Sequence, residues 1–221
     1  MKNIILIPAY EPDKKLSELV NKLYKDYEVV VVNDGSVEKE IFNKIEEECT
    51  ILTHNVNKGK GEALKTGLRY INSKYNDNDS VITVDADGQH KCEDIINLLN
   101  VINLNENSFV LGVRNFGKGT PFRSKLGNKI TSKIFKHYLN YDLSDTQTGL
   151  RAFKVSLVPF LLDIEGSRYE YEMNVLIQCI KKDVPFIQIP IETIYLDNNK
   201  SSHYKTIKDS YRIYKLIRKY K

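Results

Sequence analysis

Short apolar runs rich in β-branched residues alternate with stretches of helical spacing along the first half of this chain, and this alternation limits the possible folds most. The expected strands cover residues 4–7, 28–33, 51–54, 81–84 and 108–114. Strands that are apolar along their whole length are buried on both faces, as in parallel sheets joined by helices. We therefore predict an α/β fold with a mostly parallel, Rossmann-like sheet and helices on both faces.

The second half of the chain is less regular. A basic amphipathic helix is expected over residues 123–139, and residues 145–151 are polar and expected to be irregular. A further helix is expected over 169–182. The run 186–191 is expected to be an edge strand, because Pro190 within it cannot donate to a sheet ladder.

The composition of the chain argues against several classes of protein. The chain has 221 residues, of which 41% are hydrophobic, and a net charge of +4. These values are typical of a globular domain and not of a disordered chain. No basic stripe with interleaved aromatic residues points to nucleic-acid binding, so we expect none. The three cysteines are far apart and odd in number, so they predict neither a disulfide framework nor a zinc site.

The positive charge is concentrated at the end of the chain. Residues 201–221 carry seven Lys or Arg against one acid, Asp209, and their apolar residues fall at helical spacing. We expect a main domain over 1–200 and a basic amphipathic helix over 201–221. That helix would pack on the domain core, or bind an anionic membrane surface or a partner helix. With no segment resembling a transmembrane helix, we expect a cytoplasmic protein, peripheral at the inner face of the membrane if the helix docks there.

An Asp-x-Asp sequence follows the expected strand 81–84. Side chains alternate along an extended chain, so Asp85 and Asp87 would point to one side and Ala86 to the other. Two carboxylates at the tip of a buried strand form a hard-oxygen site suited to Mg²⁺ or Mn²⁺, and such a cation can hold a diphosphate. The alternative is an ordinary surface turn, in which Asp and Gly are favoured.

Other polar loops are expected at the same edge of the sheet, because the C-terminal ends of parallel strands meet there. They are the loops 8–10, 34–36 and 57–61. Tyr10 is then placed to stack on a base, and Asp34 to accept a hydrogen bond from the base or from a ribose hydroxyl. The glycine-rich loop 57–61 would allow the backbone to approach a nucleotide closely. Together the loops predict a nucleotide-binding crevice.

Seven motifs follow one another in the order found in family 2 glycosyltransferases of the GT-A fold. They are Ile-Pro-Ala-Tyr (7–10), Val-Asn-Asp-Gly-Ser (32–36), Asn-x-Gly-x-Gly (57–61), Asp-Ala-Asp-Gly-Gln-His (85–90), Gly-Val-Arg (112–114), Thr-Gly-Leu-Arg-Ala-Phe (148–153) and Tyr-Glu-Tyr-Glu-Met (169–173). In particular, the chain resembles the branch that contains dolichyl-phosphate mannose and glucose synthases and their bacterial polyprenyl-phosphate counterparts.

This resemblance implies a nucleotide-sugar-dependent hexosyltransferase with three sets of site residues. Nucleotide-sugar binding would involve Pro8, Ala9, Tyr10, Glu11, Asp34, Gly59, Lys60, Asp85 and Ala86. The divalent metal, Mg²⁺ or Mn²⁺, would be held by Asp87 and Gln89. The catalytic candidates, which include arginines for acceptor or sugar-phosphate oxygens, are Asp87, Asp145, Arg114, Arg123 and Arg151.

The expected reaction moves a hexose from a UDP-sugar or GDP-sugar, with inversion, to a polyprenyl-phosphate-type acceptor. A phosphate acceptor is already anionic, whereas a glycan hydroxyl in cell-surface polysaccharide synthesis needs a general base. Asp145 is the first candidate for that base, before Glu170 and Glu172. A sugar nucleotidyltransferase is an alternative class, but its glycine-rich phosphate loop is missing after the first strand. A non-catalytic scaffold with the same fold is another, and the intact Asp-x-Asp sequence argues against it.

Overall fold

The computed structural model describes residues 1–115 and 122–192 of the chain. The basic helix expected over 201–221 lies outside these residues, and the domain boundary at residue 200 stays a prediction. Among the described residues, none of the helices combines the length and the apolar character needed to cross a bilayer.

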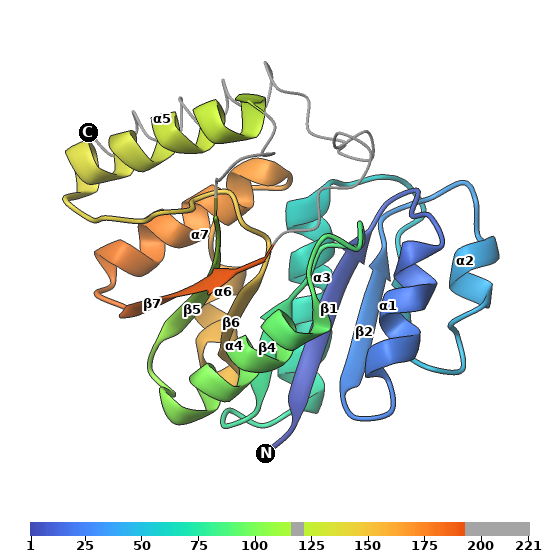
Figure 1. The fold of residues 1–221 in the computed structure, drawn as a ribbon. Helices are drawn as coiled ribbons and strands as arrows, with labels where there is room; N and C mark the ends of the chain where they lie inside the picture. Colours follow the sequence, from blue (N-terminus) through green and yellow to red (C-terminus); the bar gives the residue numbers. More distant parts are fainter. Residues whose placement is uncertain (116–121, 193–221) are drawn as a thin grey trace.

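The described residues form a seven-stranded sheet that runs through the centre of the molecule (Figure 1). Its strands are β1 (Asn3–Ala9), β2 (Glu28–Asn33), β3 (Thr50–Thr53), β4 (Ser80–Thr83), β5 (Phe109–Arg114), β6 (Arg151–Lys154) and β7 (Phe186–Ile191). They lie in the order β3-β2-β1-β4-β6-β5-β7. Every pairing is parallel except the two that β6 makes, which confirms the mostly parallel sheet.

Helices cover both faces of this sheet (Figure 1). One face carries α1 (Lys15–Leu23), α2 (Glu40–Asn43) and α4 (Cys92–Leu104). The other carries α3 (Lys60–Lys74), α5 (Phe122–Leu139), α6 (Val158–Leu162) and α7 (Tyr169–Lys181), with a 3-10 turn at Val155–Leu157 before α6. The two-sided cover confirms the α/β class expected from the alternating pattern.

Strand β1 shows why the apolar runs are continuous. Ile4 and Leu6 pack into the hydrophobic core on the α3 face, while Ile5 and Ile7 pack into the core on the α1 face. All of them are fully buried. Because successive side chains point to opposite faces, a strand between two helical layers needs an apolar residue at every position.

Strand β6 was not expected from the sequence. It lies between β4 and β5 and is antiparallel to both, with Ala152 opposite Ile82 on one side and Val110 on the other. The segment begins with Arg151 and ends with Lys154, so no apolar run marks it as a strand. The two neighbouring strands, which supply hydrogen-bond partners on both sides, determine its conformation.

The extended conformation predicted for the Asp-x-Asp sequence is wrong. Strand β4 ends at Thr83, and Ala86 and Asp87 lie in a turn that continues to Gly88, whose φ is 70°. The chain therefore bends between the two carboxylates, and strand alternation does not orient them. A turn was the alternative interpretation, and it is this turn that positions Asp87.

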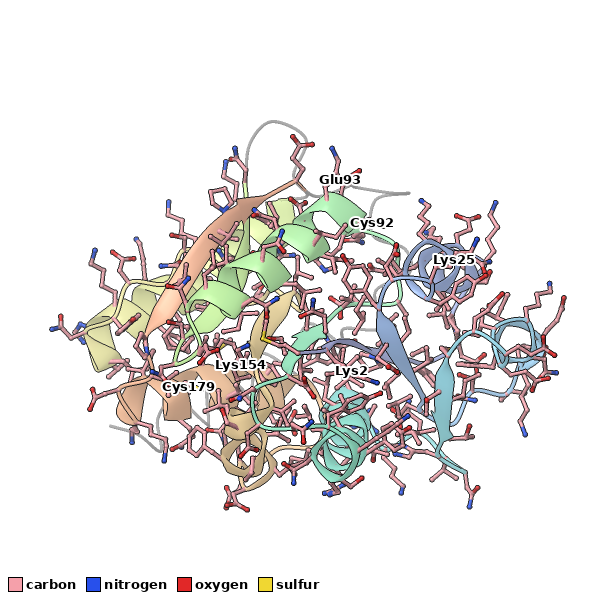
Figure 2. All side chains as sticks on the ribbon, turned by 90° about the horizontal axis from the view of Figure 1, so that it is seen from below. Lys2, Lys25, Cys92, Glu93, Lys154 and Cys179 are labelled. Carbon is pink, nitrogen blue, oxygen red and sulfur yellow. The ribbon has the colours of Figure 1, made fainter. Side chains whose placement is uncertain are left out.

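The N-terminal edge of the sheet, which faces the viewer in Figure 2, carries a separate group of charges. The backbone N–H of Lys2 donates to Asp79 Oδ1 (2.6 Å), and Lys154 Nζ donates to the carbonyl oxygen of Asn78 (2.9 Å). Burial lowers the pKa of Lys154. These groups lie at the end of the sheet opposite to the predicted crevice, so they belong to the packing of the chain's N-terminus.

Candidate active site

The predicted loops meet at the C-terminal edge of the parallel strands. The loop after β1 contacts the loop after β2 through Glu11, whose N–H donates to Ser36 Oγ (2.9 Å) and whose Oε1 accepts from the N–H of Val37 (2.8 Å). Glu11 has a φ of 45°, in the left-handed region. It therefore ties two loops together, and its contact with a donor stays a prediction.

The end of β1 presents one aromatic ring at this edge. Pro8 is half-buried and Ala9 is buried, and the Ala9 carbonyl accepts from the N–H of Asp34 (2.8 Å). The next residue, Tyr10, is 37% exposed. An exposed aromatic ring beside polar loops is suited to stacking on a base.

Asp34 links the loop after β2 to the glycine-rich loop. Its Oδ1 accepts from the N–H of Lys58 (2.9 Å) and its Oδ2 from the N–H of Gly59 (2.8 Å). Oδ1 also lies 2.7 Å from His54 Nδ1. Asp34 is 2% exposed, so its carboxylate is buried and is held by these three partners.

Lys60 links the glycine-rich loop to the Asp-x-Asp turn. Its Nζ lies 2.7 Å from Asp85 Oδ1 and 2.8 Å from Glu172 Oε2, which belongs to the first turn of α7. Burial opposes the charged form of Lys60, but attraction by the two carboxylates outweighs burial and raises its pKa above the ordinary value. One ammonium therefore neutralises charge from two elements that are distant in the sequence.

Asp85 is strongly held in its ionised form. Burial alone would raise its pKa, but Lys60, followed by His90, holds the pKa of Asp85 well below its usual range. The Nε2 of His90 lies 3.8 Å from Asp85 Oδ2. The backbone of Gly149 closes the other side: a Cβ there would lie 2.4 Å from Asp85 Oδ2, so only glycine leaves room for this carboxylate.

Asp87 is oriented by its own turn. Its Oδ1 accepts from the N–H of Gln89 (3.0 Å). Burial, followed by repulsion from Asp85, raises the pKa of Asp87. Asp87 resists ionisation because it is half-buried and because Asp85 beside it is already charged. A bound cation would offset this repulsion, so the pair of carboxylates favours cation binding.

The residues present fit a divalent cation. Asp87 and Gln89 supply hard oxygen atoms, which Mg²⁺ and Mn²⁺ prefer. Among residues 1–115 and 122–192, no three His, Cys, Asp or Glu side chains come together as a complete metal site. An ion held here would therefore take further oxygen ligands from water or from a diphosphate.

Two catalytic candidates are paired with each other. Arg114, at the end of β5, donates from Nε to Asp145 Oδ2 (2.6 Å) and from its second terminal nitrogen to Oδ1 (3.0 Å). Asp145 also accepts from the N–H groups of Arg114 and Gln147, and it is fully buried. This arrangement favours a structural role for Asp145 over the role of a general base.

Of the other two arginine candidates, the structure describes the contacts of Arg151 alone. Arg151 is 3% exposed and donates to the carbonyl oxygens of Thr148 (2.9 Å) and Glu172 (2.6 Å), so it ties the start of β6 to the start of α7. Arg123 lies in the first turn of α5, and its side chain is outside the described part of the structure. Their contacts with phosphate oxygens stay predictions.

Three residues that shape the site were not among the predicted site residues. His54 and Thr66 form a hydrogen-bonded chain to Asp34, and the backbone of Gly149 lies against Asp85. Glu172 was predicted as a candidate base, and the structure pairs it with Lys60. Gly149 lies in the motif 148–153, so motif membership was a signal for it. For Thr66, in the middle of an ordinary helical pattern, the sequence contained no signal.

A mostly parallel sheet, whose C-terminal edge gathers a glycine-rich loop, an aromatic ring and an Asp-x-Asp turn, defines the class of nucleotide-dependent α/β enzymes. Within that class, the family model of Glycosyl transferase family 2 matches residues 4–161. The chain belongs to this family and is a nucleotide-sugar-dependent glycosyltransferase, as its motifs predicted.

Named relatives extend this assignment. The chain is 31% identical to a UDP-N-acetylglucosamine–dolichyl-phosphate N-acetylglucosaminyltransferase of Methanococcus voltae, over 87% of this chain and 86% of the relative. It is 26% identical to the dolichyl-phosphate β-glucosyltransferase of Saccharomyces cerevisiae, over 89% of this chain and 68% of the relative. These names confirm the resemblance to the dolichyl-phosphate branch.

Solved structures confirm the GT-A fold. Glucosyl-3-phosphoglycerate synthase from Mycobacterium tuberculosis, crystallised with phosphoglyceric acid, superposes with a TM-score of 0.74 at 14% identity, over 99% of this chain and 79% of that one. A second crystal structure of that enzyme, with Mn²⁺, UDP and phosphoglyceric acid, gives a TM-score of 0.70 at 14% identity, over 99% and 76% of the two chains.

Proposed function

We propose that this enzyme transfers a hexose from a UDP-sugar or GDP-sugar to a polyprenyl-phosphate-type acceptor, with inversion at the anomeric carbon. The observation that carries the proposal is the cluster of Lys60, Asp85 and Asp87, where cationic and metal-binding groups lie together at the crevice edge. Two relatives named as dolichyl-phosphate transferases support the acceptor class. Because such an acceptor lies in a membrane, we expect the enzyme to work at a membrane surface.

The donor would be bound by the loops in a defined order. Tyr10 would stack on the base, and the loop that contains Gly59 would follow the ribose and diphosphate with its backbone. Lys60, which already carries a firmly held proton, would place positive charge near the diphosphate. Asp87 and Gln89 would hold Mg²⁺ or Mn²⁺. When bound, that cation stabilises the negative charge that develops on the departing nucleoside diphosphate.

The acceptor phosphate would have to be positioned by the enzyme, but no proton would have to be removed from it. A phosphate acceptor is anionic at neutral pH, so a general base is unnecessary. This agrees with the pairing of Asp145 with Arg114, which occupies both oxygens of the first candidate base. Of the three arginine candidates, Arg123 is the one we assign to the acceptor phosphate, because Arg114 and Arg151 have buried partners.

A donor panel tests the proposal. Purified protein is incubated with Mn²⁺ or Mg²⁺ and with each common UDP-sugar and GDP-sugar, and release of nucleoside diphosphate is measured with and without polyprenyl phosphate. We expect nucleoside diphosphate to be released from one donor, and at a higher rate when polyprenyl phosphate is present. The variant Asp87→Asn should release none. Release that ignores the lipid would move the acceptor to a glycan hydroxyl. No metal-dependent release from any donor would overturn the proposal.

A further inference from the structure

Three side chains form a hydrogen-bonded chain beside the crevice, and two of them, His54 and Asp34, are buried. His54, which follows β3, lies with Nδ1 2.7 Å from Asp34 Oδ1 and with Nε2 2.9 Å from Thr66 Oγ1 on α3. The His54 side chain is 5% exposed and that of Asp34 is 3% exposed. The histidine is thus shielded from water, and both ring nitrogens have a protein partner.

One direction in this chain follows from chemistry. An ionised carboxylate can only accept, so His54 Nδ1 donates to Asp34. The hydroxyl of Thr66 can both donate and accept, so it can pair with Nε2 whichever role that nitrogen takes. The ring of His54 is therefore held at both ends, and this limits its rotation and that of Asp34.

The chain ends on the loop that would bind the nucleotide. Asp34 accepts the N–H groups of Lys58 and Gly59, and Gly59 is the N-cap residue of α3, with a φ of 101°. The backbone at Gly59 also packs closely on the segment before α7, because a Cβ on Gly59 would lie 2.6 Å from the carbonyl oxygen of Ser167. The residue after Gly59 is Lys60, whose ammonium lies 2.7 Å from Asp85. The position of Asp34 therefore affects the position of the Lys60 ammonium in the site.

We propose that His54 and Thr66 are positioning residues for nucleotide binding. They hold Asp34 in the one orientation that pins the backbone at Lys58 and Gly59 and thereby places Lys60 beside Asp85. The inference rests on the proposed function where it concerns nucleotide affinity, whereas the order of the loop can be tested without any nucleotide. Neither residue touches a reacting atom in this assignment.

The test removes a threonine hydroxyl at each of two positions, Thr66 and Thr50. The Thr66 hydroxyl lies near His54, which follows β3, and the Thr50 hydroxyl lies near Tyr70 of α3. Thr66→Val removes the hydroxyl while it keeps the shape, and Thr66→Ser keeps the hydroxyl. Thr50→Val is the matched control, because Thr50 Oγ1 lies 3.4 Å from the Tyr70 hydroxyl of α3 but does not contact Asp34. His54→Leu and His54→Asn form a second pair, in which only Asn retains an N–H that can reach Asp34.

Two measurements are made on the full-length chain. The first is hydrogen exchange of the Lys58 and Gly59 amides without nucleotide. The second is the Kd for UDP and for GDP in the presence of Mn²⁺. For Thr66→Val we expect exchange about tenfold faster and a Kd about tenfold higher, the scale of one lost hydrogen bond in a buried network. The donor KM should rise with kcat unchanged, because binding is weakened equally before and during reaction. Thr66→Ser and Thr50→Val should stay near wild type. His54→Asn keeps the N–H toward Asp34 but loses the contact with Thr66, so it should resemble Thr66→Val and be less impaired than His54→Leu.

The outcomes distinguish the positioning role of His54 and Thr66 from the proposed function of the enzyme. Wild-type exchange and wild-type Kd in folded Thr66→Val and His54→Leu would overturn the inference, as would an equal effect of Thr50→Val. If Thr66→Val fails to fold, the contrast between His54→Leu and His54→Asn decides. If wild type binds neither nucleotide, the proposed function fails, and the exchange measurement still decides whether the side chains order the loop.

Discussion

At the scale of single residues, Lys60 is the centre of the site. Its ammonium lies between Asp85, which follows β4, and Glu172, in the first turn of α7. Two carboxylates that contact the same ammonium, one of them half-buried and the other buried, repel each other unless a cation lies between them. The same ammonium thus stabilises the fold and supplies positive charge to the crevice.

Lys60→Met should therefore destabilise the protein and weaken donor binding. Removal of one partner from a buried ion pair leaves uncompensated charge, which typically costs about 3–5 kcal/mol. Denaturant unfolding monitored by circular dichroism measures this loss. The matched control is Lys44→Met, which breaks an exposed pair with Glu40 on α2 and should change stability little. Equal stability of the two variants would contradict the bridging role.

The same pair predicts a dependence on pH. The pKa of Asp85 is lower in the folded protein than its ordinary value, so its stabilisation is present above about pH 4 and is lost as the pH falls below that value. In Lys60→Met the pKa of Asp85 is depressed less, so the free energy of unfolding should fall less steeply with acid than in wild type. Parallel slopes in urea titrations between pH 5 and pH 2 would contradict this.

Gly149 is the residue whose substitution tests the Asp85 carboxylate most directly. Gly149→Ala would place a Cβ 2.4 Å from Asp85 Oδ2, so the carboxylate must move away from Lys60. We expect kcat/KM for the donor to fall by about 10–100-fold, the effect of a misplacement of about 1 Å in a catalytic site. Circular dichroism should show an unchanged fold. Full activity with a native melting temperature would contradict the close approach.

At the scale of elements, the segment before β6 is held by one ion pair. Asp145 accepts two hydrogen bonds from the guanidinium of Arg114 at the end of β5, and it also accepts the N–H of Gln147. Asn128 on α5 donates to the carbonyl oxygen of Ser144, next to Asp145. The segment is therefore tied to β5 through Asp145 and to α5 through Asn128.

Asp145→Asn separates this structural role from that of a base. Loss of the carboxylate charge leaves Arg114 half-buried without its ion-pair partner, and we expect a loss of about 3 kcal/mol in the free energy of unfolding. Turnover measured well below the melting temperature should remain within about tenfold of wild type, because a phosphate acceptor needs no base. A stable variant with no turnover would instead identify Asp145 as the base.

Elements with strong local periodicity were predictable, and the one without it was not. The helix predicted over 169–182 is α7 (Tyr169–Lys181), and the edge strand around Pro190 is β7 (Phe186–Ile191). Strand β6 has only four residues, with a basic residue at each end. Its conformation depends on hydrogen bonds from β4 and β5, and a sequence window does not contain those partners.

At the scale of the whole molecule, the site is formed by loops from distant parts of the chain on a shared sheet (Figure 1). Asp34, Lys60 and Asp85 each follow a different strand, while Glu172 comes from α7 near the end of the described residues. A ligand that contacts several of these loops binds only the folded chain. Ligand binding should therefore stabilise the molecule as a unit.

Nucleoside diphosphate with Mn²⁺ should raise the melting temperature. At a ligand concentration of about 100 times the Kd the gain is about 2.7 kcal/mol, or roughly 5–10 °C for a domain of this size. Scanning calorimetry with UDP and with GDP measures this shift and identifies the preferred base. Addition of EDTA, or the substitution Asp87→Asn, should abolish most of the shift. A shift that survives both would place the nucleotide elsewhere.

Local sequence patterns were enough to predict the layers of the fold and the edge of the sheet at which the site lies. Alternating apolar runs and helical stretches are local patterns, and burial of both strand faces follows from them. The polar loops after β1, β2, β3 and β4 then meet at one edge because parallel strands end there.

Which charged groups are partners depends on tertiary contacts. Lys60 bridges Asp85 and Glu172, Arg114 holds Asp145, and His54 connects Thr66 to Asp34. Each of these contacts joins segments whose separation in the sequence carries no information about their distance in space. The turn at Asp87 and the antiparallel β6 have the same origin, since neighbouring elements, and not local preference, determine them.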